Sequence, residues 1–282
     1  MVPSYFTSRL PAELDDVQVT SALILASASG CFLLKAAMSS QIAQASSQDW
    51  STEWGGTWRY GWPHVFRRVL TETYQRERES AGVYAGEVFK DRDDDFPVRA
   101  VLPEKKAVKE LFHLCRLTTD GVVTVGSERY WLLGYEWPNQ GGDGEKGRRA
   151  DLVGVNAAGG LVVFECKLEN NDGPLTAVLE GLDYLSHLTS QPNFDKLASG
   201  FTRWAGKPGR VRPSGFEIVS PLWDSSHEVV VLASQAYFVQ HRRSQRSPGW
   251  ELFAALPTGS SSPVIRFAES DFTSSQARWV TG

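Results

Sequence analysis

Two apolar runs joined by a short turn rich in Asn and Gly constrain this chain more than any other feature. The runs cover residues 151–155 and 161–168. Such runs on either side of a short Asn- and Gly-containing turn are typical of a β-hairpin. The pattern therefore predicts a sheet-containing fold with a hairpin near its centre.

The length of the turn predicts the register of this hairpin. A symmetric register that pairs Val155 with Leu161 places Asp151 opposite Glu165. Because side chains alternate between the two faces of a strand, Glu165 and Lys167 share a face. Opposed side chains lie about 4.5–5.5 Å apart at Cβ, a separation that one divalent cation can bridge. A slip of one residue would move Asp151 to the other face.

These residues resemble the signature of the PD-(D/E)XK nuclease superfamily, also called restriction-endonuclease-like. The signature is an Asp on one strand and Glu-x-Lys on the next, which here are Asp151 and Glu165-Cys166-Lys167. The resemblance implies an α/β fold with a restriction-endonuclease-like mixed β-sheet core flanked by helices. It also implies a metal-dependent nuclease.

A predicted helix downstream of the hairpin extends the resemblance. The exonuclease-like branch of the superfamily carries Gln-x-x-x-Tyr on this helix, and residues 175–188 contain Glu180-Gly-Leu-Asp-Tyr184 at that spacing. Glu in place of Gln departs from the family pattern and adds a negative charge. Glu180 and Tyr184 are nevertheless candidate site residues.

A second helix, predicted over residues 103–117, precedes the sheet. Its apolar positions form one arc at 100° per residue. Glu104 falls near the centre of that arc, and Glu110 lies at its margin. The family usually places one more acid on this helix, so Glu104 is the favoured carboxylate and Glu110 the alternative.

The resemblance implies how these residues would act. Asp151, Glu165 and the backbone carbonyl of Cys166 would hold Mg²⁺ or Mn²⁺, and Lys167 would orient a water or stabilise developing charge. Glu104, Glu180 and Tyr184 would complete the catalytic group. The implied enzyme is an endo- or exodeoxyribonuclease. The alternative is a non-catalytic module that binds nucleic acid or protein and retains the nuclease fold.

Positive charge is concentrated near the hairpin although the chain as a whole carries a net charge of -4. Basic residues precede Asp151, and a further stretch between Asp195 and Glu217 contains only basic charges. Such segments favour contact with phosphate. The predicted partner is nucleic acid, with DNA favoured. The sequence also leaves open whether the chain forms a homodimer. The candidate substrate-binding residues are Arg148, Arg149, Arg203, Arg210 and Arg212.

Composition along the chain predicts two regions. Residues 1–100 form a helical, Trp-rich N-terminal region of unknown role, with helices near 17–45 and 63–79. Residues 101–282 form the nuclease-like domain, and its segment at about 190–226 is rich in Gly, Pro and Ser and predicts an insertion or long loop. The last two strands are expected near 250–254 and 263–268.

Cysteine usage and hydropathy bear on the cellular compartment. Cys31, Cys115 and Cys166 form an odd set without paired spacing, which suits a reducing cytoplasm. Residues 17–34 are uncharged but contain too many polar side chains for a membrane-spanning helix. We therefore expect a cytoplasmic protein that does not contact a membrane.

Overall fold

The structure is a computed structural model that describes most of the chain beyond residue 101. The expected N-terminal helices and the Trp-rich stretch lie outside the described residues, apart from Arg78, which is helical. The described residues are Arg78, 102–138, 149–169, 173–205, 213–218, 222–242, 249–254 and 262–280.

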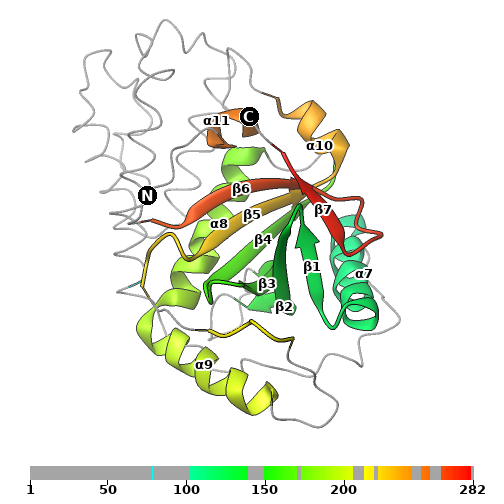
Figure 1. Ribbon diagram of the computed structural model, residues 1–282. Helices are drawn as coiled ribbons and strands as arrows, with labels where there is room; N and C mark the ends of the chain where they lie inside the picture. The colour runs from blue at the N-terminus through cyan, green and yellow to red at the C-terminus, as the bar shows by residue number, and fades with distance from the viewer. Residues whose placement is uncertain are drawn as a thin grey trace, which may run out of the picture.

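In this part of the chain one helix precedes four consecutive strands, and pairs of helices flank the fifth strand before the last two strands (Figure 1). The strands are β1 (Val122–Val125), β2 (Glu128–Pro138), β3 (Arg149–Asn156), β4 (Leu161–Lys167), β5 (Glu228–Ala233), β6 (Val264–Glu269) and β7 (Gln276–Trp279). The helices are α7 (Pro103–Thr118), α8 (Pro174–Thr189), α9 (Gln191–Ala205), α10 (Gln235–Gln240) and α11 (Trp250–Ala254).

The strands form one closed barrel of mixed direction, in the order β1 to β7. Strands β1 to β4 are successive antiparallel neighbours, and β4, β5 and β6 run parallel. Strand β7 runs antiparallel to β6 and closes the barrel by pairing in parallel with β1, through Thr124–Gln276 and Val125–Ala277.

The predicted restriction-endonuclease-like fold, an open mixed sheet flanked by helices, is therefore wrong. The closing strand β7 has the sequence Gln-Ala-Arg-Trp, and each of its side chains keeps some contact with solvent. Such a segment has no apolar run, so its pattern does not predict a strand. Without β7 the remaining strands would form an open sheet.

Two segments differ from the predicted secondary structure. The segment expected as a long loop begins with helix α9, in which Phe194, Leu197 and Phe201 are buried at helical spacing. The strand expected near 250–254 is helix α11, where Trp250 and Phe253 lie three residues apart and are both buried. Helix α11 is only five residues long and α9 contains both Pro and Gly, so helical spacing is a weak signal in these segments.

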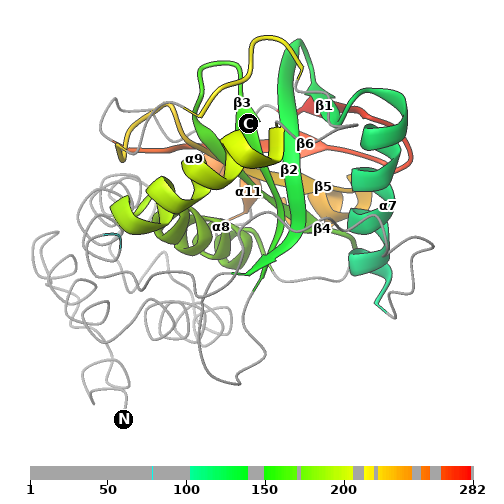
Figure 2. The ribbon, with the colours of Figure 1, turned by 90° about the horizontal axis from the view of Figure 1, so that it is seen from below.

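Apolar side chains form two clusters on the two faces of the strands. Alternate residues such as Val163 and Val231 pack with α8, α9, α10 and α11, whereas Val162 and Val230 pack with α7. Figure 2 shows α7 on one side of the strands and α8 with α9 on the other. Burial on both faces explains why β4 and β5 are apolar throughout most of their length.

Candidate active site

The hairpin of β3 and β4 brings the two predicted acids to the same end of the strand pair. Its ladder has the register expected from the turn, with Val155 opposite Leu161. Continued one step past its last pair, this register places Asp151 at the level of Glu165. The backbone amide of Cys166 donates a 2.8 Å hydrogen bond to Asp151 Oδ2, which holds this carboxylate against β4.

Lys167 supplies an ammonium group between these acids and helix α8. Its side chain is 7% exposed, and Nζ lies 3.7 Å from Glu165 Oε2 and 3.4 Å from Glu180 Oε2. Burial alone would lower the pKa of Lys167, but the surrounding carboxylates outweigh burial and raise that pKa above its ordinary value. Lys167 is therefore held as a cation. The carboxylates are those of Glu165, Glu180, Asp151 and Glu104.

Asp151 ionises less readily than an ordinary aspartate. Burial raises its pKa to about 7, and the nearby Glu104 and Glu180 add to this effect. The Lys167 ammonium and the hydrogen bond from the Cys166 amide act in the opposite direction and lower that pKa. Negative charge is thus costly at this position, so a bound cation would favour the ionised carboxylate.

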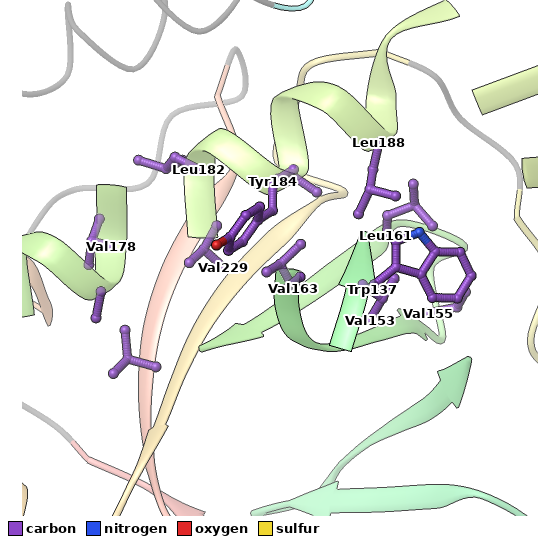
Figure 3. Close-up of a cluster of buried hydrophobic side chains, with 14 of the residues drawn as sticks. Trp137, Val153, Val155, Leu161, Val163, Val178, Leu182, Tyr184, Leu188 and Val229 are labelled. Carbon is purple, nitrogen blue, oxygen red and sulfur yellow. The ribbon is translucent and has the colours of Figure 1, made fainter. Parts of the chain in front are cut away.

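Helix α8 brings Glu180 and Tyr184 to the face of the sheet that carries Glu165. A Cβ added at Gly181 would lie 2.4 Å from Val229 Cγ1 and 3.4 Å from Glu165 Cγ, so glycine permits this close approach of helix and sheet. Figure 3 shows Tyr184 between α8 and the strands. Burial and the neighbouring carboxylates raise the pKa of the Tyr184 phenol, which keeps it protonated.

The two candidate acids of α7 have different surroundings. Glu104 is partly buried, and it lies close enough to Asp151 to raise the pKa of that carboxyl. The Glu110 side chain is 50% exposed and pairs with Lys106 at 3.8 Å on the same helix. The contacts therefore support Glu104 over Glu110 as the acid of α7 that belongs to the cluster.

The donor set at the hairpin end suits a cation that takes few protein ligands. Within the described residues, no group of at least three His, Cys, Asp or Glu side chains is arranged to hold a metal ion. Mg²⁺ commonly binds through one or two carboxylates and keeps several waters, so Asp151 and Glu165 fit that requirement. The Cys166 thiol packs in the apolar cluster under α7, so only its backbone carbonyl remains a candidate ligand.

No protein-family model, curated protein or solved structure matches this chain. Of the helices that the structure describes, none combines the length and the apolar character that crossing a membrane requires.

Of the predicted substrate-binding residues, only Arg149 has a described side chain. Arg149 lies at the start of β3, two residues before Asp151, and its NH1 is 3.7 Å from Glu136 Oε2. Its side chain is 51% exposed. Arg148, Arg210 and Arg212 lie outside the described residues, and so does the side chain of Arg203.

A second polar cluster, not predicted from the sequence, lies at the other end of these strands. Buried Glu228 accepts a 2.8 Å hydrogen bond from Asn156 Nδ2 through Oε1, and its Oε2 lies 3.1 Å from the Tyr130 hydroxyl. Arg266 NH2 donates at 2.7 Å to Glu128 Oε1. The available signal was Glu228 itself, a charged residue that opens an otherwise apolar strand.

Proposed function

We propose that this protein is a metal-dependent nuclease that hydrolyses phosphodiester bonds in nucleic acid, with DNA as the favoured substrate. The observation that carries the proposal is the convergence of Asp151, Glu165 and Lys167 at one end of the hairpin. The proposal rests on this local geometry and on the motif resemblance to PD-(D/E)XK nucleases. It does not depend on the family's overall fold.

Asp151 and Glu165 would hold Mg²⁺ or Mn²⁺, with the Cys166 carbonyl as a further ligand. When bound, the ion lowers the pKa of a coordinated water and neutralises charge that develops on the phosphate. Lys167 would stabilise this charge and orient the attacking water. Its raised pKa favours such a role over that of a general base, because the amine stays protonated.

The remaining residues would orient this group. Glu180 lies 3.4 Å from Lys167 Nζ and would hold the ammonium in place. The protonated Tyr184 phenol could donate a hydrogen bond to a phosphate oxygen. Glu104 would bind a water of the metal shell, since it lies near enough to Asp151 to affect its ionisation.

A cleavage assay on single- and double-stranded DNA and on RNA, with and without Mg²⁺ or Mn²⁺, tests the proposal. We expect metal-dependent cleavage by the wild type and a loss of at least about 100-fold in Lys167→Ala and Asp151→Asn, the order of magnitude for removing one group that stabilises transition-state charge. Lys106→Ala is the matched control, because Lys106 is exposed and pairs with Glu110. Equal rates in all three variants would refute the proposal.

A non-catalytic nucleic-acid- or protein-binding module is the second candidate. It is favoured by Glu180, which stands where the family pattern has Gln and forms an ion pair with Lys167. Under this alternative the full chain would bind nucleic acid or a protein. With any added metal ion, its cleavage rate would be no higher than that of the Lys167→Ala variant.

A further inference from the structure

Three basic side chains surround a single carboxylate on β2. Glu136 Oε1 lies 3.7 Å from Lys105 Nζ. Its Oε2 lies 3.8 Å from Lys109 Nζ and 3.7 Å from Arg149 NH1. We call Lys105, Lys109, Arg149 and Glu136 the α7 basic cluster. With three cations and one carboxylate, the cluster has an excess of positive charge.

This cluster borders the candidate active site. Glu136 lies between Tyr135 and Trp137, which pair with Leu152 and Ala150, the two neighbours of Asp151. Strand β2 therefore places the backbone of Glu136 level with that of Asp151 on the neighbouring strand. The other members are also close along the chain, because Lys105 follows Glu104 and Arg149 precedes Asp151 by two residues.

Glu136 shares with Asp120 and Phe272 a left-handed backbone conformation. The φ of Glu136 is 44°, which lies in the left-handed region that residues other than glycine rarely adopt. Such a conformation persists only where the surrounding structure imposes it, and it is common at functional sites. Here the pairing of both neighbouring residues with β3 holds Glu136 in this conformation.

Fastening α7 to the sheet explains only part of the arrangement. Lys109, whose side chain is 16% exposed and also lies over the Tyr135 ring, would suffice to fasten the helix. The more exposed pairs of Glu136 with Lys105 and Arg149 would add only about 0–1 kcal/mol each. The observed distances of 3.7–3.8 Å also exceed the roughly 2.7–2.9 Å of a charge-assisted hydrogen bond. Lys105 and Arg149 keep 52% and 51% of their side chains exposed, so both can reach an anion in solution.

We propose that the α7 basic cluster binds the phosphate backbone of the nucleic acid on which the neighbouring site acts. This inference rests on the proposed function. A polyanion that approaches the acids of the site meets repulsion, and the adjacent excess of positive charge offsets it. Glu136 keeps the three cations together, so the phosphates would meet a preformed surface.

Binding measured over a range of salt concentrations tests the inference, in full-length chains that carry Asp151→Asn to suppress cleavage. The probes are duplex DNA, single-stranded DNA and duplex RNA. We expect Lys105→Gln/Lys109→Gln to weaken binding about tenfold in Kd and to reduce the salt slope by about 0.9 for each lost contact with duplex DNA, or about 0.7 with single strands. The probe with the largest change identifies the preferred backbone.

Two further variants keep this test decisive. Arg149→Gln removes a cation from β3 and should weaken binding in the same direction even if the double variant disturbs α7. Lys106→Gln is the control, because it removes one charge from the same helix outside the cluster. Its Kd should stay within about twofold of the parent's, as expected for a charge that contacts no phosphate.

The inference is overturned if the parent binds none of the probes, or if the cluster variants bind as Lys106→Gln does with unchanged salt slopes. Its failure is distinguishable from that of the nuclease proposal. Binding that depends on the cluster, without cleavage by the wild type, would contradict only the nuclease proposal. Metal-dependent cleavage that is unaffected by substitution of Lys105, Lys109 and Arg149 would contradict only the proposed role of the cluster.

Discussion

At the scale of single residues, the candidate site contains several charged groups whose burial costs free energy of folding. Asp151 has a raised pKa, and Lys167 is nearly buried between Glu165 and Glu180. Buried charges are retained where pairing or a ligand offsets their desolvation. The pairs of Lys167 with Glu165 and Glu180 offset part of that cost, and under the proposed function a cation at Asp151 would offset more of it.

Asp151→Asn should stabilise the metal-free protein at alkaline pH. The folded-state pKa of about 7 exceeds the ordinary value of 3.8, so the protonated carboxyl stabilises the fold at low pH and this contribution is lost as pH rises through about 7. Asn is neutral throughout and can still accept the hydrogen bond from Cys166. In EDTA we expect a higher Tm than wild type at pH 8 and a smaller difference at pH 5.

Each kcal/mol gained would raise the Tm by about 2–4 °C in a chain of this size. Glu110→Gln is the control for this measurement, because it removes an exposed carboxylate. A lower Tm for Asp151→Asn than for wild type at pH 8 would contradict the electrostatic account of the site.

Glu228, in the second polar cluster, is another buried carboxylate whose pKa is raised by burial. The Tyr130 hydroxyl lies 2.8 Å from Glu128 Oε2 and 3.1 Å from Glu228 Oε2, and one phenol proton cannot be donated to both carboxylates. Arg266 NH1 lies 3.2 Å from the same hydroxyl and 3.5 Å from Glu228 Oε2. Burial nevertheless raises the pKa of Glu228, whereas Arg266 lowers the pKa of Glu128.

Glu228→Gln should therefore remove a pH-dependent part of the stability. The contribution of protonated Glu228 is complete below the ordinary pKa of 4.5 and is lost as pH rises through the raised folded value. Gln reproduces the protonated form, so the stability of the variant relative to wild type should increase from pH 5 to pH 8. Urea unfolding at both pH values measures this difference. A difference that is the same at both values would show that Glu228 is ionised throughout.

At the scale of elements, the hairpin and the two flanking helices could be predicted, and the strand that closes the barrel could not. The β3–β4 register followed from the turn, α7 followed from apolar periodicity, and α8 was expected from the motif resemblance. Strand β7 has no such pattern, because it is stabilised by partners far away in the chain. Glu136 was also missed, since its position depends on the pairing of β2 with β3.

Gly181→Ala tests how α8 is seated on the sheet. The added methyl group would overlap Val229 Cγ1, which is buried and stiff, at a cost of about 1–3 kcal/mol. The higher helix propensity of Ala returns about 1 kcal/mol. We expect net destabilisation in urea unfolding together with reduced cleavage, because Glu180 and Tyr184 would shift with the helix.

Ala177→Gly is a suitable comparison, because it lowers the helix propensity of α8 at another buried position. If Gly181→Ala were as stable and as active as wild type, the close approach of α8 would have no role in placing Glu180.

At the scale of the whole molecule, one barrel carries an acidic cluster at each end of the same strands. Asp151 and Glu165 lie where β3 begins and β4 ends, whereas Asn156 and Glu228 lie near the opposite ends of their strands. The Glu228 cluster has a guanidinium, an amide and a phenol as partners. Its role is to join strands that the sequence keeps far apart.

The contrast between the two clusters allows a direct test of the central claim, which is that the hairpin end binds a divalent cation. Titration of the full chain with Mn²⁺ followed by calorimetry, with Mg²⁺ as competitor, measures this binding. We predict one saturable Mn²⁺ that is lost in Asp151→Asn and Glu165→Gln and retained in Glu228→Gln. Absence of saturable binding by the wild type, or equal loss in Glu228→Gln, would contradict the account.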